Sequence, residues 1–220
     1  MKVYIINRDR LQSPKEMVEF LLKTPGVTPI IMDNDSKNPD LLDWYETSPC
    51  EIVRHDLNWG ETIMWMPDLN YIEYYGLKDG NYCVTDPDLD LAGIPLNWPD
   101  ELKRLLVENQ WCDKAGFSLE INDLPDNEIT REVIAHEENH WHTPLSGGGF
   151  RAGIDTSFAA YRSSIHSFEC VRASRPYTAK HRNWYYQSVD DIPADEKFYL
   201  SRINASHNHW SYKIKQRNGL

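Results

Sequence analysis

Short apolar segments alternate with helical patterns through the first 90 residues, and this alternation limits the possible folds more than any other feature. Apolar segments rich in β-branched residues at 2–6, 28–32, 51–54 and 82–85 predict four buried strands. Helical spacing with a proline in the first turn predicts helices from Ser13 to the stop at Pro25-Gly26 and over 39–46. A further helix is expected over 62–75. Strands that alternate with helices are typical of an α/β protein with a parallel sheet.

The pattern loosens after about residue 90. Helices are expected over 98–109 and 127–141, and strands over 116–121, 153–161 and 167–172, followed by a polar tail rich in aromatic residues. The chain shows no internal repeat and no linker of low complexity, so we expect residues 1–220 to form a single domain.

Charge and cysteine usage exclude several classes of function. The net charge is -11, and no cluster of Lys and Arg is present that could neutralise nucleic-acid phosphates, so we expect no nucleic-acid partner. The four cysteines form no CxxC pair, which favours reduced thiols over a structural zinc site. No apolar stretch approaches the length of a membrane span, and the N-terminal apolar run is too short for a signal peptide. We expect a cytoplasmic protein, in the host cytoplasm if the source is a virus.

The motif Asp86-Pro87-Asp88 directly follows the fourth predicted strand. Open α/β sheets bind ligands beyond the carboxyl ends of their strands, so these carboxylates are placed as ligand-binding groups. Hard oxygen ligands suit Mg²⁺ or Mn²⁺, and such an ion can stabilise a departing diphosphate as a Lewis acid. An ordinary acidic turn is the alternative, and we favour the metal site.

The order of these segments resembles the GT-A type of nucleotide-sugar glycosyltransferase, in particular the small single-domain members of bacteria and large viruses. The similar segments are Asn7-Arg8-Asp9, Asp33-Asn34-Asp35-Ser36 and Thr85-Asp86-Pro87-Asp88, each after a strand, and 117–125, 154–162 and 177–185 further on. The resemblance thus extends over about residues 3–190. It implies a Rossmann-like GT-A fold with a mixed, mainly parallel central sheet flanked by helices. Residues 1–90 would form the nucleotide-binding half, and residues 91–220 the acceptor half and tail.

The resemblance also implies a nucleotide site at the first two strands. Asn7 and Arg8 would line the pocket for base and ribose, and Arg8 could also pair with a phosphate. The acidic residue after the second strand contacts the nucleoside in this family, which assigns Asp33 to that contact, with Asp35 as the alternative.

The implied metal site adds a residue from far along the chain. Asp88 would be the direct ligand, Asp86 would face the ribose or the metal, and His181 would supply a second protein ligand to Mn²⁺ or Mg²⁺. Without the resemblance, His181 between Lys180 and Arg182 would be interpreted as a solvent-exposed histidine.

The expected reaction needs a base near the acceptor hydroxyl, and Asp155 is the candidate. An Asp155 that pairs with Arg151 or Arg162 for structural reasons is an equally good interpretation. The expectation is transfer of a hexose or deoxyhexose from a UDP-, GDP- or dTDP-sugar to a saccharide acceptor hydroxyl, with inversion.

A competing motif, His136-Glu137-Glu138-Asn139-His140, matches the HExxH pattern of zinc-dependent hydrolases. Two histidines four residues apart share one face of a helix and can bind zinc, with Glu137 as base and Glu169 as a possible third ligand. The extended pattern is absent, because position 142 is His where Gly would fall. A third interpretation, a carbohydrate-binding module without catalysis, suits the 8 Trp and 12 Tyr, but such modules are usually all-β. We favour the transferase.

Overall fold

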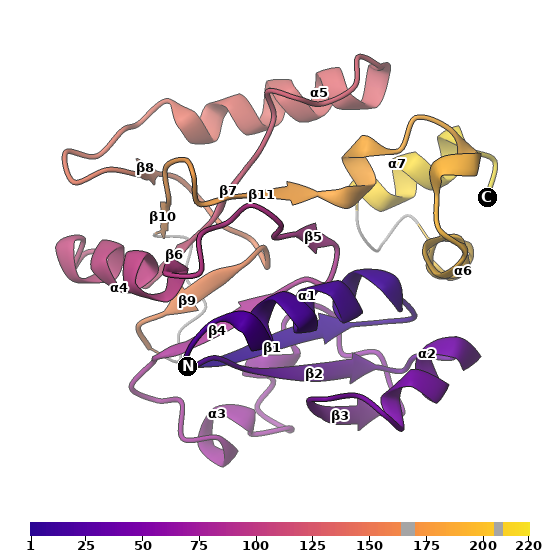
Figure 1. Ribbon diagram of the computed structural model, residues 1–220, viewed down its shortest axis with the longest axis horizontal. Helices are drawn as coiled ribbons and strands as arrows, with labels where there is room; N and C mark the ends of the chain where they lie inside the picture. The colour runs from indigo at the N-terminus through magenta and orange to yellow at the C-terminus, as the bar shows by residue number, and fades with distance from the viewer. Residues whose placement is uncertain (164–169, 205–208) are drawn as a thin grey trace.

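The computed structural model describes residues 1–163, 170–204 and 209–220, and it is built around an eight-stranded sheet (Figure 1). The strands lie in the order β3 (Glu51–His55), β2 (Thr28–Asn34), β1 (Lys2–Asn7), β4 (Tyr82–Thr85), β9 (Ala159–Tyr161), β6 (Lys114–Gly116), β10 (Cys170–Arg172), β8 (Phe150–Arg151). The first four are parallel, whereas β9 runs antiparallel to β4 and β6, and β8 antiparallel to β10. The expected α/β architecture with a mainly parallel central sheet is therefore confirmed.

The four expected strands of the first 90 residues are confirmed, and helices cover both of their faces. Alternate residues of β1 enter different clusters, with Val3 and Ile5 in one and Tyr4 and Ile6 in the other. A strand buried on both faces has a continuous apolar sequence rather than an alternating one, which explains the apolar run at its start.

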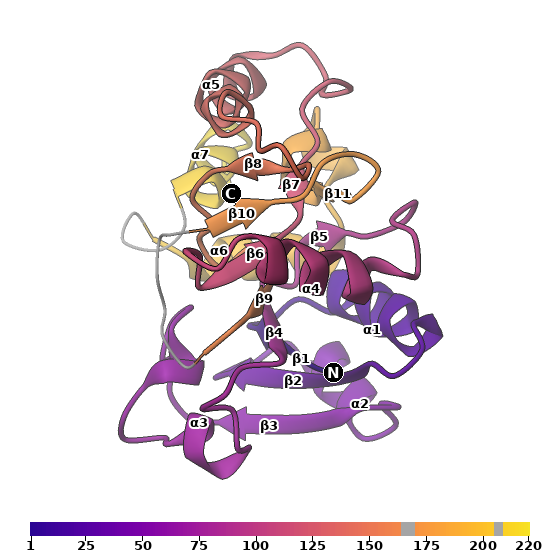
Figure 2. The ribbon, with the colours of Figure 1, turned by 90° about the vertical axis from the view of Figure 1, so that its left-hand side faces the viewer.

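Helices α1 (Gln12–Lys23) and α4 (Trp98–Glu108) lie side by side on one face of the sheet (Figure 2). Helix α1 buries Met17, Val18 and Leu21 in the same cluster as Val3 of β1. Helix α2 (Pro39–Tyr45) begins at Asn38, whose side chain accepts a hydrogen bond from the backbone N–H of Asp40 (3.2 Å). Such a cap satisfies a backbone donor that has no partner within the helix.

The expectation of one helix over 62–75 is wrong, because the structure has two short helical pieces there. A 3₁₀ turn, η1 (Ile63–Trp65), is followed by the four-residue α3 (Tyr71–Tyr74). Met66 is extended before Pro67, as residues before proline usually are, and Asn70 has a left-handed backbone with φ 50°. Both features interrupt the helical hydrogen-bond pattern.

The strands expected in the second half are shorter than the sequence predicts. The segment 116–121 is divided between β6 and β7 (Ser118–Leu119), which belong to different sheets. Of the segment 153–161 only β9 is a strand, and of 167–172 the described part is β10, residues 167–169 lying outside the described residues. The helix expected over 127–141 is α5 (Glu128–Glu137), which continues as the 3₁₀ turn η2 (Glu138–Trp141).

The expected polar tail contains regular structure. Strand β11 (Thr178–His181) pairs with β5 (Leu89–Asp90) and β7 in a second, three-stranded sheet. Two 3₁₀ turns, η3 (Arg182–Tyr185) and η4 (Val189–Asp191), lead to helices α6 (Ala194–Arg202) and α7 (His209–Arg217). Figure 1 shows both helices on the side to which the arrowheads of β1 and β2 point. In the described ranges, no helix has the length and apolarity needed to cross a membrane.

Candidate functional site

A cavity of about 380 Å³ lies at the carboxyl ends of β1 and β4. Arg8 and Arg10 from the loop after β1 form part of its wall, and Asp86 and Asp88 from the loop after β4 form another part. The loop before β9 adds Asp155 and Thr156, the segment after β3 adds Asn58, and α6 adds Tyr199. The predicted placement of Asp86, Asp88 and Asp155 around one cavity agrees with the rule for open α/β sheets.

Asp86 is the carboxylate with the least favourable surroundings for a negative charge. Its Oδ2 accepts a hydrogen bond from the Thr156 hydroxyl (2.7 Å), and its backbone N–H donates to the Thr156 carbonyl (3.0 Å). Burial, followed by the charges of Asp88 and Asp155, raises the pKa of Asp86 to about 8. Burial and the two neighbouring carboxylates thus favour the neutral form of the Asp86 carboxyl, whereas a cation bound beside it would favour the charged form.

Asp88 lies between a guanidinium and an imidazole and is 3% exposed. Its Oδ2 is 3.2 Å from Arg10 Nη2 and 3.6 Å from His181 Nε2. Burial opposes the charge of Asp88, but His181 and Arg10 outweigh this effect and hold the pKa of its carboxyl below the ordinary value. The pairing of β5 with β11, in which His181 opposes Leu89, brings the two predicted ligands together.

His181 itself is buried, contrary to the exposed histidine that its charged neighbours indicate. Its ring stacks on Trp184 with 4.6 Å between ring centroids and 8° between planes. Its Nδ1 is buried, and no group in the described residues forms a hydrogen bond with it. The other ring nitrogen, Nε2, is the one near Asp88, and an imidazole nitrogen beside a carboxylate can contribute to a divalent-metal site. Within the described part of the chain, the ligand atoms of Asp86, Asp88 and His181 nevertheless do not all lie within 4.8 Å of one another.

Asp155 lines the cavity and is held by its own loop. Its Oδ1 accepts hydrogen bonds from the backbone N–H (2.9 Å) and the hydroxyl (2.5 Å) of Ser157, and its carbonyl accepts one from Lys114 Nζ (2.9 Å). Removal of water disfavours its charge, but Ser157, Arg172 and His181 together hold the pKa of Asp155 below the ordinary value. Of the two arginines considered as structural partners, Arg162 donates to the Cys112 carbonyl (3.0 Å).

Asn7 and Asp33, the residues expected to contact a nucleoside, are both 0% exposed. The Asn7 amide donates to the Tyr45 hydroxyl (3.0 Å), and that hydroxyl donates to Asp33 Oδ2 (2.8 Å). These side chains fix the ends of β1 and β2 to α2 and do not line the cavity. Asp35, the alternative, pairs with Lys37 (2.6 Å) and is not in the cavity wall either. Arg8 and Asp86, also predicted for the nucleotide site, do line the cavity.

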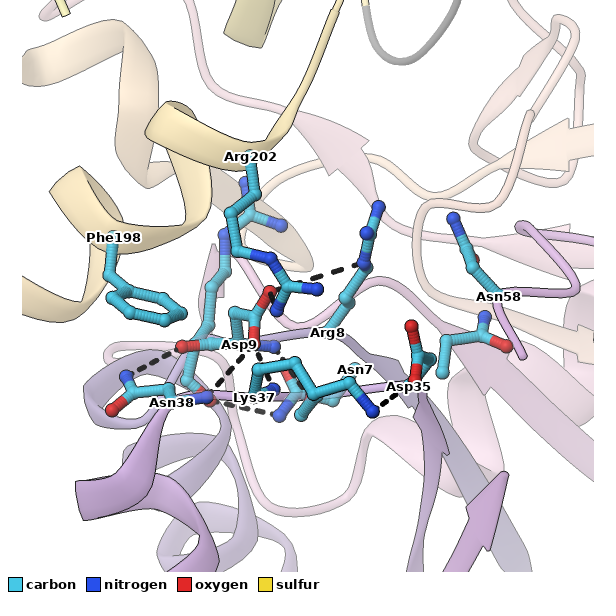
Figure 3. A network of polar contacts seen from close by, with 12 residues as sticks. Asn7, Arg8, Asp9, Asp35, Lys37, Asn38, Asn58, Phe198 and Arg202 are labelled. Atoms are coloured by element: carbon cyan, nitrogen blue, oxygen red, sulfur yellow. Dashed lines mark hydrogen bonds and ion pairs between the residues drawn. The ribbon is translucent and has the colours of Figure 1, made fainter. Parts of the chain in front are cut away.

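Asp9 has a central position that the sequence did not indicate (Figure 3). This residue is 0% exposed and has a left-handed backbone with φ 61°. Its carboxylate accepts hydrogen bonds from the backbone N–H of Lys37 (2.6 Å) and from Arg202 of α6 (2.5 Å), and it lies 3.9 Å from Arg8 Nε. Asp9 thus contacts the Arg8 side chain and connects the loop after β2 with the C-terminal helix α6. No local pattern predicts a partner 193 residues away.

The HExxH residues line a second cavity of about 220 Å³, which Asp86, Asp155 and His181 line as well. Glu137 Oε2 lies 2.7 Å from Arg172 Nη1, and both side chains are about 5% exposed. Burial, followed by the charge of Arg172, lowers the pKa of His140. A carboxylate held by a buried arginine is poorly placed to accept a proton from water, which weighs against a hydrolase. Glu169 lies outside the described residues.

Comparison with known proteins does not assign the chain to a family. No protein-family model matches the sequence, and a search of the curated proteins finds no match.

Proposed function

We propose that this chain is a metal-dependent glycosyltransferase that moves a sugar from a nucleoside diphosphate sugar to a saccharide hydroxyl. The observation that carries the proposal is the cavity beyond β1 and β4, which Arg8 lines together with the carboxylates Asp86 and Asp88. A diphosphate bound together with a divalent ion would suit this cavity. The arginine can pair with a phosphate, and the two carboxylates can bind the ion.

Asp88 and His181, with help from Asp86, are the residues that would hold Mn²⁺ or Mg²⁺. The bound ion would supply Lewis-acid stabilisation of the diphosphate leaving group. Arg8 adds a positive charge at the same cavity, and the Asp9 carboxylate lies 3.9 Å from its Nε. Preorganised charge of this kind stabilises the negative charge that develops as the bond to the leaving group breaks.

Asp155 is the proposed base because it belongs to the walls of both cavities. The acceptor hydroxyl would give its proton to Asp155 while its oxygen forms a bond to the anomeric carbon and the diphosphate departs with its electron pair. The lowered pKa keeps Asp155 ionised at neutral pH, so it is able to accept a proton. A single displacement of this kind inverts the anomeric configuration.

Calorimetry with UDP-, GDP- and dTDP-sugars, with and without Mn²⁺, tests the proposal. We expect one of the nucleotide sugars to bind only when Mn²⁺ is present, and Asp88→Asn to abolish that dependence. Asp155→Asn should keep donor binding and lose transfer, since it retains the shape of the side chain and removes the base. If no nucleotide sugar binds in the presence of Mn²⁺, the proposal is wrong.

A further inference from the structure

The clustered histidines at the end of α5 belong to no step of the proposed transfer. In the part of the chain that the structure describes, His136, Glu137 and His140 are the only three His, Cys, Asp or Glu residues whose ligand atoms all lie within 4.8 Å of one another. We infer that these three residues bind one transition-metal ion of the zinc class, at a site separate from Asp86 and Asp88.

The local backbone presents the two imidazoles to the same space. Helix α5 ends at Glu137 and tightens into η2, so His140 lies one short turn beyond His136. Their ring centroids are 5.5 Å apart, with the rings nearly perpendicular at 77°. The Asn139 amide donates to the carbonyls of Ala135 and His136 (3.1 Å each), which secures this turn at the helix end.

The two oxygens of Glu137 have different surroundings. Oε2 accepts a hydrogen bond from Arg172 (2.7 Å), whereas Oε1 is directed to His136, 3.9 Å from its Nε2. Arg172 is fixed in turn by a hydrogen bond to the Gly153 carbonyl (2.8 Å). Carboxylates that bind metals are commonly oriented by such an outer partner, which leaves the second oxygen for the ion.

A small rotation of the His136 side chain would bring its Nε2 and Glu137 Oε1 to the separation found around a bound ion. Ligand atoms about 2 Å from one tetrahedral ion lie roughly 3.3 Å apart, so the distance of 3.9 Å must shorten only slightly. The His136 side chain is 58% exposed and has room to make this movement.

Charge and ligand type define the class of the ion. Three carboxylates and one guanidinium line the shared cavity, so its wall is net negative in spite of Arg172. Two imidazole nitrogens and one carboxylate oxygen suit Zn²⁺, Ni²⁺ or Cu²⁺, whereas Mg²⁺ prefers oxygen ligands alone. Glu137 is paired with Arg172 and serves as a metal ligand, so it is not free to act as a general base. The site therefore binds a metal ion without hydrolase chemistry.

Titration calorimetry of the metal-free full chain with ZnCl₂ tests the site. We expect one equivalent to bind, and His136→Ala or His140→Ala to weaken the affinity at least tenfold, since loss of even an outer partner typically costs 10–100-fold. His142→Ala is the matched control, an exposed histidine beside the site that lies outside the group, and it should bind zinc as the parent does. Co²⁺ should give the intense visible absorption of a tetrahedral site in the parent and in the control, and lose it in His136→Ala.

Equal zinc affinity in the parent and His136→Ala would overturn the inference, and so would no binding by the parent. Circular dichroism of each variant excludes unfolding as the cause of a loss. Asp88→Asn separates this site from the transferase proposal, since it should lose Mn²⁺-dependent donor binding and keep zinc. If zinc binds but no nucleotide sugar binds with Mn²⁺, the transferase site is wrongly assigned. If the nucleotide sugar binds but zinc does not, the histidine site is wrongly assigned.

Discussion

At the scale of single residues, Arg10 connects the start of the chain with its end. Its guanidinium is 2.6 Å from Glu196 of α6 and 3.2 Å from Asp88, and it lies 3.7 Å from the centre of the Tyr199 ring. The Asp88 and Glu196 carboxylates are both buried. Arg10 therefore pairs with two buried carboxylates at once and fixes Asp88 beside the cavity.

Arg10→Ala should lower the free energy of unfolding by about 3–5 kcal/mol, because it leaves buried charges without their partner. Urea denaturation followed by circular dichroism measures the change. Arg131→Ala is the control, since Arg131 pairs with Asp126 at the surface and its loss should leave the midpoint unchanged. Equal midpoints for Arg10→Ala and the parent would contradict a stabilising role.

Asp9→Asn examines the second residue-scale junction and keeps the side-chain shape. Asparagine tolerates the left-handed backbone but loses the charge that pairs with Arg202, so we expect a loss of about 1–3 kcal/mol in thermal or urea unfolding. Asp35→Asn is the matched control, since Asp35 also has a positive φ (62°) and pairs with the largely exposed Lys37. Similar losses in both variants would show that the charge of Asp9 has no special role.

At the scale of elements, the close approach of β6 and β9 fixes the loop that contains Asp155. Gly116 of β6 faces Phe158, and a Cβ at Gly116 would lie 2.2 Å from the Phe158 carbonyl oxygen. The Phe117 backbone N–H donates to that same oxygen (3.1 Å), so the two strands cannot separate without loss of this bond. The end of the Asp155 loop is therefore set by backbone contact.

Gly116→Ala should destabilise the protein by about 1–3 kcal/mol or more, because overpacking forces the backbone to move. Gly153→Ala is the control, since nothing lies within 4 Å of its added Cβ and its φ is ordinary. Differential scanning calorimetry of both variants gives the comparison. A Gly116→Ala variant as stable as Gly153→Ala would show that the strands adjust freely.

At this scale the sequence predicted some elements well and others poorly. The strands β1 to β4 have compact apolar runs, which give a clear local signal. The helix expected over 62–75 failed because Pro67 and the left-handed Asn70 outweigh the apolar spacing. Strand β11 and helices α6 and α7 were missed because their polar and aromatic residues show no clear apolar periodicity. Packing against the rest of the chain determines these elements.

At the scale of the whole molecule, the proposed cation would link the two halves of the chain. Asp88 follows β4 near the middle, whereas His181 comes from β11 and Tyr199 from α6. Under the proposed function, Mn²⁺ at 100 times its dissociation constant should stabilise the native state by about 2.7 kcal/mol and raise the Tm by roughly 5–10 °C. EDTA should reverse the shift, and Asp88→Asn should abolish it. Thermal unfolding monitored by circular dichroism measures both, and an unchanged Tm in the parent would contradict Mn²⁺ binding.

The sequence by itself determined the α/β class, the strand order in the chain and the acidic motif after β4, because each depends on neighbouring residues and strand periodicity. It also selected Asp155 and His181 as candidates, but only the tertiary structure decided which candidates meet. That structure placed Asp86, Asp88 and Asp155 at one cavity, buried Asn7 and Asp33 away from it, and brought Arg202 to Asp9. The physical reason is that burial and ion pairing between distant segments depend on the packing of whole elements, which leaves no signature in local spacing.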